Sequence, residues 1–335
     1  MWKFYKIMFF CSMILGTLIA ISSYSWMSMW MGLEINLLSI LPLLKDPKNI
    51  YPAESALKYF ITQTLASSIF LFSIIMNLNL TEFFPQNSVF MIMMNSALLT
   101  KMGAAPFHAW FPEVMEGLNW TNCLIMLTWQ KIAPMILLMY NLTMTLFYLL
   151  VIFSSLIIGG IQGLNQISLR KILAYSSINH IGWMLSSLLY SQGIWTFYFL
   201  IYSVITLNII TLLYTFQIFY IHQFNLFIPN NKMIKTLFAL NFMSLGGLPP
   251  FLGFLPKWLV INGLATNGYF YLSVSLIIFT LITLYFYLRL MFSIMTLGVA
   301  EAMTFPLAPL NFMIFLFNFI TLSGLLICTF GFNFF

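Results

Sequence analysis

The chain has 335 residues, of which 61% are hydrophobic and only 6% are charged. This balance excludes a soluble domain and predicts an all-α, polytopic membrane protein. The formal net charge of +6 does not indicate nucleic-acid binding here, because the basic residues gather in the connections on one side of the predicted membrane.

Eleven apolar stretches are long enough to cross a bilayer, which takes about 20 residues. They lie at roughly 7–25, 27–44, 55–77, 88–106, 120–140, 143–164, 171–190, 193–219, 235–261, 269–292 and 309–331. The fourth and ninth run into Gly/Pro-rich breaks. The connections are short and polar, so we expect one membrane domain over residues 1–335.

Basic residues divide unevenly between the two sides of these spans. The N-terminus and the even-numbered connections hold Lys3, Lys6, Lys45, Lys48, Lys58, Arg170, Lys171, Lys232 and Lys235, joined by Arg289, whereas the odd-numbered connections hold no Lys or Arg. The positive-inside rule therefore predicts an inside N-terminus and an outside C-terminus. Lys58 and Arg289 lie at span ends, where we expect them to snorkel. The start of the chain resembles neither a signal nor a transit peptide, so we expect insertion without a cleaved presequence.

The stretch Leu245–Trp258 is apolar but cannot form one continuous helix. Gly246 and Gly247 weaken the helix, and three prolines in the stretch each remove a backbone donor. Irregular backbone persists at membrane depth only where protein or a water-filled cavity receives its polar groups. Lys257 adds a cation beside this break, a combination typical of ion sites in transporters.

A shift of 144 residues places an earlier stretch on this one. Gly103 then falls on Gly247, and Pro106, Phe107 and Pro112 fall on identical residues, while Glu113 falls on Lys257. The two copies are five spans apart, so they would cross the membrane in opposite directions. The alternative is a chance match in a biased sequence. We predict two inverted five-helix repeats, at about 7–140 and 143–292, with an extra helix at about 309–331.

Four ionisable residues lie within spans rather than at their ends: Glu34, Lys101, Lys131 and Lys257. A charge at mid-helix costs about 2.5–3.5 kcal/mol, so each needs a partner or a function. Burial disfavours the charged form of lysine and a neighbouring carboxylate restores it, which suits proton uptake and release. The structural alternative is that Lys101 and Lys257 only cap carbonyls freed by the breaks. Glu34 needs a cation in the middle of its span, and Lys101 is the obvious candidate.

His180 lies in the middle of the seventh span, on a face with Ser176 and Ser177 that could hold water. We consider a proton relay there, against ordinary hydrogen-bonded packing. For His108 and Glu113 a stabilising role in the loop is as plausible as chemistry.

Cysteines and histidines are scattered and match no metal-binding spacing, and no nucleotide-binding glycine motif is present. We therefore expect no metal, nucleotide or redox cofactor in this chain.

Five motifs together resemble the subunit 2 family of mitochondrial NADH:ubiquinone oxidoreductase, respiratory complex I. They lie at Trp30–Asn36, Lys101–Val114, Thr128–Pro134, Gly163–Trp183 and Gly246–Trp258. The resemblance runs from about Trp26 to Arg289, whereas the two ends match only in hydrophobicity.

The resemblance implies an antiporter-like fold of two inverted five-helix repeats and a proton path through the matching residues Glu34, Lys101, Lys131, His180 and Lys257. Relatives have fourteen helices, and animal mitochondrial members lack the first three. It also implies the mitochondrial inner membrane, with the N-terminus on the matrix side and the C-terminus on the intermembrane-space side. NADH, FMN, iron–sulfur clusters and ubiquinone would be held by other subunits. The expected partners are membrane-arm subunits and lipids such as cardiolipin, with no nucleic acid.

We therefore expect a proton-translocating subunit in which movement of Glu34 relative to Lys101 changes the proton affinity of Lys131, with transfer onward toward Lys257. Two alternatives stay open. A free-standing sodium/proton antiporter would work alone, but the chain offers no carboxylate-rich ion site. A purely structural subunit would use its lysines only as caps.

Overall fold

The computed structural model describes residues 4–45, 49–80, 88–223, 232–296, 318–319 and 321–324. These residues form thirteen α-helices and one short 3-10 helix, and no sheet is found among them. The chain divides into two compact units, Met1–Ser155 and Leu156–Phe335. The all-helical prediction is confirmed.

The first unit contains seven complete helices and the start of an eighth. They are α1 (Phe4–Ser22), α2 (Trp26–Leu44), α3 (Tyr51–Leu80), α4 (Ser88–Met102), α5 (Trp110–Gly117), α6 (Trp120–Leu127), α7 (Trp129–Met139) and the beginning of α8 (Thr145–Leu164). The second unit holds the rest of α8, then α9 (Leu169–Leu188), α10 (Gln192–Phe216), η1 (Ile221–Gln223), α12 (Lys232–Gly246), α13 (Phe254–Thr266) and α14 (Phe270–Thr296).

Seven of the helical segments that the structure describes are long and apolar enough to cross a membrane. They are α1, α2, α3, the α6–α7 segment, α8, α10 and α14. Three other predicted spans coincide with α4, with α9 and with the α12–α13 pair. The eleventh, 309–331, lies almost wholly outside the described residues, which are helical at 318–319 and 321–324.

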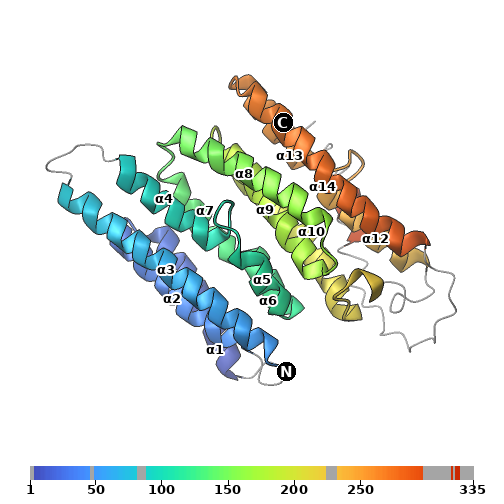
Figure 1. The fold of residues 1–335 in the computed structure, drawn as a ribbon, viewed down its shortest axis with the longest axis horizontal. Coiled ribbons are helices and arrows are strands. Elements are labelled where there is room, and N and C mark those ends of the chain that lie inside the picture. The colour runs from blue at the N-terminus through green and yellow to red at the C-terminus, as the bar shows by residue number, and fades with distance from the viewer. Residues whose placement is uncertain are drawn as a thin grey trace. The chain divides into compact units, whose positions relative to one another are not determined.

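In the first unit α1, α2 and α3 lie side by side (Figure 1). Small residues let α1 and α2 approach closely, since a Cβ on Gly16 would lie 2.8 Å from the backbone nitrogen of Asn36. A Cβ on Gly32 would meet the Ala20 backbone nitrogen at 2.5 Å. This crossing fixes the position of the α2 segment that carries Glu34 and Asn36.

In the second unit α9 is the buried helix. It contains four serines, one asparagine, one histidine and two basic residues, which make it less apolar than the seven long spans, yet nearly all of its residues are buried. It contacts α10, α13 and α14, and Figure 1 shows α12 and α14 running beside each other. Gly159 on α8 packs against α9 in the way that Gly16 packs against α2. A Cβ on Gly159 would lie 2.8 Å from the backbone nitrogen of Asn179, the same distance as from a Cβ on Gly16 to that of Asn36.

The helices that lead into the two predicted breaks end in the same way. Helix α4 ends at Gly103 (φ +73°), whose N–H donates to Thr100 O, while the Ala104 N–H donates to Leu99 O. Helix α12 ends at Gly247 (φ +77°) with the same two bonds, from Gly247 to Ser244 O and from Leu248 to Met243 O. This is the left-handed glycine termination that satisfies the last carbonyls of a helix. Each partner lies 144 residues from its counterpart.

A third interruption was not predicted from the sequence. The expected continuous span 120–140 is divided at Thr128 (φ −115°, ψ −71°), between α6 and α7. The Thr128 hydroxyl donates to Leu124 O at 2.7 Å, and Lys131 N–H bonds to Thr128 O in a tighter i−3 pattern. Serine and threonine hydroxyls that bond backward in this way often bend helices. Lys131 therefore lies in the first turn after an irregularity.

Candidate functional site

The first unit buries two of the predicted lysines. Lys101, in the last turn of α4, is 7% exposed, and Lys131 in α7 is 1% exposed. The Lys131 ammonium lies 5.7 Å from the centroid of the Phe111 ring, within the range of a cation–π contact. Lys101 lies near the negative end of its helix dipole, where a cation is stabilised.

Glu34 on α2 is partly buried, and its Oε1 atom is buried without a hydrogen-bond partner among the described residues. Its charge acts on Lys101, but the two side chains do not form a direct ion pair in the part of the chain that the structure describes. Glu34 and Lys101 therefore interact electrostatically at a distance, and not through the direct contact that an ion pair would make. An uncompensated buried carboxylate oxygen is costly, so a hydrogen-bond donor at this oxygen would be stabilising.

Uncharged polar side chains connect the helices that hold these charges. Asn36 on α2 and Gln130 on α7 exchange two side-chain hydrogen bonds, each 3.0 Å long. The Tyr59 hydroxyl on α3 donates to Gln130 Oε1 at 3.5 Å, and Gln63 Nε2 donates to Lys101 O at 3.4 Å. The sequence search missed these residues because it counted ionisable side chains. The signal that could have found them is a cluster of amides within apolar spans.

In the second unit Lys257 lies in the first turn of α13, 6% exposed. Its ammonium folds back across the break and donates to Gly246 O at 2.8 Å and Leu245 O at 3.3 Å, the last carbonyls of α12. It also lies 5.8 Å from the centroid of the Trp183 ring on α9. Lys257 therefore caps the end of α12, as the structural alternative expects. It is also a buried titratable group, so capping does not exclude a role in proton transfer.

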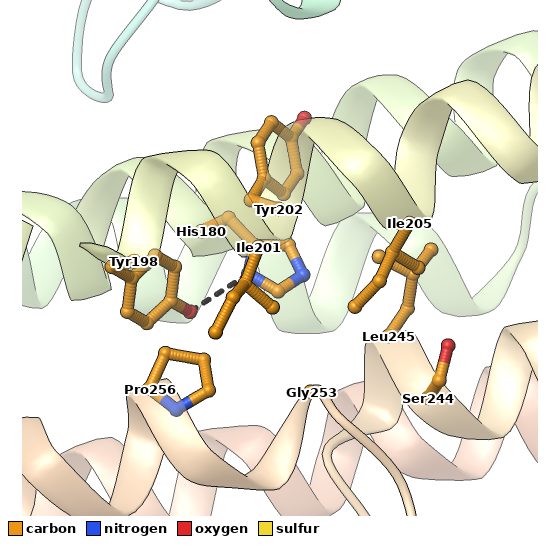
Figure 2. A pocket seen from close by; sticks show the side chains of 9 residues that line it. All are labelled: His180, Tyr198, Ile201, Tyr202, Ile205, Ser244, Leu245, Gly253 and Pro256. Atoms are coloured by element: carbon orange, nitrogen blue, oxygen red, sulfur yellow. Dashed lines mark hydrogen bonds between the residues drawn. The ribbon is translucent and has the colours of Figure 1, made fainter. Parts of the chain in front are cut away.

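His180 on α9 is 5% exposed and faces the same break. Its Nδ1 lies 2.9 Å from the hydroxyl of Tyr198 on α10. Figure 2 shows the imidazole beside Tyr198 and Tyr202, with Gly253 and Pro256 across a small cavity. This cavity has room for about one water molecule. Its remaining lining is Ile201, Ile205, Ser244 and Leu245.

The two serines expected to share a face with His180 donate their hydroxyls to backbone carbonyls of their own helix, Ser176 to Leu173 O at 2.9 Å and Ser177 to Ala174 O at 2.8 Å. The sequence did not identify Tyr198 and Tyr202, which line the same cavity as His180. Aromatic residues make up 18% of the chain, so nothing in their spacing distinguishes these two.

The remaining predicted residues are exposed or half-buried. Glu113 is exposed and accepts a bond from Lys58 at 3.1 Å, and Glu54 lies 3.2 Å from the same ammonium. Lys58 is thus held by carboxylates. Arg289 is half-buried and donates to Leu164 O at 2.6 Å and to Gln166 O at 2.9 Å, so it caps the end of α8. His108 is half-exposed, with Nδ1 3.3 Å from Pro106 O.

No group of three or more His, Cys, Asp or Glu side chains that could hold a metal ion is found among the described residues. Each unit thus holds its own set of buried groups beside a broken helix: lysines, a carboxylate and neutral amides in the first, and a lysine, a histidine and tyrosines in the second. Such groups can accept and release protons and can be bridged by water. This combination defines an antiporter-like class of multi-pass membrane protein.

Comparison with known proteins agrees with that class. The family model described as "NADH:quinone oxidoreductase/Mrp antiporter, TM" matches residues 23–284. NADH-ubiquinone oxidoreductase chain 2 of Anopheles gambiae is 51% identical over 329 residues, covering 95% of each chain. The corresponding protein of Aedes aegypti is 49% identical over 328 residues, with 96% of each chain covered. A chain of respiratory complex I from Thermus thermophilus is 25% identical with a TM-score of 0.84, covering 97% of this chain and 78% of that one.

The chain therefore belongs to the NADH-ubiquinone oxidoreductase chain 2 family, within the wider group of quinone oxidoreductase and Mrp antiporter membrane subunits. It is a subunit of NADH:ubiquinone oxidoreductase, complex I. A chain of the archaeal membrane-bound sulfane sulfur reductase shares the fold, with a TM-score of 0.82 at 16% identity.

Proposed function

We propose that the chain is a proton-translocating module of the membrane arm of complex I, and that it carries no electrons itself. The observation that supports this most directly is the burial of Lys101, Lys131 and Lys257, which are 7%, 1% and 6% exposed. Only 6% of the residues in the chain are charged. Burial at such a cost is typical of groups that bind and release protons inside membranes.

In the first unit, Glu34 acts as the charge that responds to electron transfer elsewhere in the complex. A change in its charge or position alters the field at Lys101 and the proton affinity of Lys131. The electrostatic interaction of Glu34 with Lys101, without a direct ion pair, supports this role. A direct ion pair would hold both charges tightly and would oppose proton exchange.

In the second unit, protons pass by way of His180 and water toward Lys257. The cavity beside His180 is lined by residues on both sides of the α12–α13 break, and Lys257 lies in the turn that follows it. Histidine is suited to a relay because its charge changes near neutral pH. Transfer from Lys131 to this unit is part of the same proposal.

The finer architecture belongs to this proposal as well. We propose eleven membrane crossings in two inverted five-helix repeats, at about 7–140 and 143–292, with an extra helix at about 309–331. The equal helix ends at Gly103 and Gly247, with the same positive-φ glycine and the same hydrogen bonds, support the repeat. The proposed location is the mitochondrial inner membrane, with the N-terminus on the matrix side. Other membrane-arm subunits and lipids such as cardiolipin would cover the apolar surface, and other subunits would hold NADH, FMN, iron–sulfur clusters and ubiquinone.

The test is Lys131→Met in the assembled complex, reconstituted into sealed vesicles. We expect the rate of proton pumping to fall on the order of 10²-fold, the scale on which a positioned proton-transfer group contributes. Lys58→Met is the matched control, since that lysine belongs to the same unit but is exposed. A wild-type pumping rate and a wild-type ratio of protons to electrons in Lys131→Met would contradict the proposal.

The structural alternative is favoured at one position, because Lys257 caps α12 directly. If buried lysines serve only as caps, substitution should reduce the amount of assembled complex and leave the pumping of what assembles unchanged. Measuring both quantities for each lysine separates the two functions.

A further inference from the structure

The turn of α7 that carries Lys131 is weakly held by its own helix. On its N-terminal side the helix is interrupted at Thr128, and the Lys131 N–H reaches Thr128 O in an i−3 bond. On its C-terminal side Pro134 has no N–H to offer to Gln130 O, four residues earlier. The regular hydrogen-bond ladder is therefore disturbed on both sides of Lys131.

The side chain of Gln130 supplies an attachment to other helices at this point. Its amide forms a closed ring of two 3.0 Å hydrogen bonds with Asn36, and its oxygen also accepts from Tyr59. Gln130 is 9% exposed and Asn36 is 4% exposed. Two simultaneous bonds between planar amides fix orientation as well as distance.

The other end of this attachment is rigid. The backbone nitrogen of Asn36 lies where α1 approaches α2 most closely, so close that a Cβ on Gly16 would be 2.8 Å from it. Asn36 follows Glu34 by two residues on α2, and Gln130 immediately precedes Lys131 on α7. The amide pair therefore joins the segment that bears the carboxylate to the turn that bears the lysine.

We infer that Asn36 and Gln130 are a positioning pair, which holds the Lys131 ammonium in register with the Glu34 segment. This inference rests on the proposed function, in which Glu34 controls the proton affinity of Lys131. Neutral amides do not titrate, so the pair transmits position and carries no proton. A displacement of α2 would move Lys131 with it.

The chain provides a control pair with the same chemistry. Asn95 on α4 and Asn141, just after α7, are also buried and joined by two amide hydrogen bonds, of 2.9 and 3.3 Å. One of these bonds ends on the backbone oxygen of Asn141. This pair is not adjacent in sequence to Glu34 or Lys131. Asn95→Leu removes a buried amide of the first unit without touching the proposed link.

The experiment compares Asn36→Leu, Gln130→Leu, the double variant and the exchange Asn36→Gln/Gln130→Asn in the assembled complex in vesicles. We expect each single variant to lower the pumping rate on the order of 10²-fold, since a misplacement of about 1 Å can cost that much. The double variant should be no worse than the singles, because both break one link. The exchange should recover most of the rate, and Asn95→Leu should pump like the wild type at equal assembly.

If the leucine variants do not assemble, Gln130→Asn alone replaces them, with Asn36→Gln added for rescue. Wild-type pumping in the single variants, multiplying effects in the double variant, an equal loss in Asn95→Leu or a failure of the exchange to restore pumping would overturn the inference. Lys131→Met is measured in parallel. Wild-type pumping there defeats the proposed function, whereas loss there with wild-type pumping in Gln130→Leu defeats the positioning role alone.

Discussion

The two units share one way of ending a helix but differ in the side chains beside it. Each has a helix that ends at a left-handed glycine, Gly103 or Gly247. Each also has a glycine packed against the backbone of an asparagine on the next helix: Gly16 of α1 against Asn36, and Gly159 of α8 against Asn179. In the first unit that asparagine is bonded to Gln130, whereas Asn179 Oδ1 in the second is buried without a hydrogen-bond partner among the described residues. A repeated framework therefore does not imply repeated polar contacts.

The charges at the breaks differ in the same way. In the first unit the lysine precedes the break on α4, and the Trp110 Nε1 caps Thr100 O at 3.1 Å. In the second the lysine follows the break and caps α12 itself. The residue equivalent to Lys257 is Glu113, which is exposed and bonded to Lys58. The framework fixes where a helix breaks, and the side chains decide whether the break holds a neutral donor or a proton-binding group.

The largest effect should come from a side chain that one break tolerates and the other excludes. A Cβ at Gly253 would lie 1.8 Å from Ser244 O, whereas the equivalent position in the first unit is Ala109. We expect Gly253→Ala to cost more than about 4 kcal/mol, the range of severe backbone or packing clashes, and to abolish assembly on native gels. Ala109→Gly should cost at most about 1 kcal/mol. Normal assembly of Gly253→Ala would show that the two breaks are interchangeable.

An intermediate effect should follow from removing the two different caps. Lys257→Met leaves the Leu245 and Gly246 carbonyls without their donor, and we expect a loss of about 1–3 kcal/mol, since buried unpaired polar groups carry that cost. Trp110→Phe removes one neutral bond and should cost about 1 kcal/mol. Thermal denaturation of the assembled complex measures both. Only Lys257→Met should also lower proton pumping, and unchanged pumping there would reduce Lys257 to a cap.

The smallest effect should come from Glu113→Gln, at the position equivalent to Lys257. Glu113 and Lys58 are both exposed, and exposed ion pairs contribute little because water screens them. We expect wild-type assembly and a wild-type proton-to-electron ratio. A changed ratio would place the charge of the first break in the proton path and would remove the asymmetry between the units.

Much of the local structure could be predicted from the sequence. Glycine and proline at 103–112 and 247–256 ended helices where expected, because their effect on the backbone does not depend on neighbours. The interruption at Thr128 was missed, since a single threonine in an apolar span usually continues the helix. Of the eleven predicted spans, the last lies almost wholly outside the residues that the structure describes.

The sequence by itself determined that the chain is an all-helical membrane protein, where two of its helices break, and that Lys101, Lys131 and Lys257 are buried. Each follows from the cost of placing a given residue type in hydrocarbon. Tertiary structure alone decided the bonding of Asn36 to Gln130, the contact of His180 with Tyr198, and the return of Lys257 onto α12. Neutral amides and phenols in a span give no distinctive signal in the sequence, and their partners depend on which helices pack together.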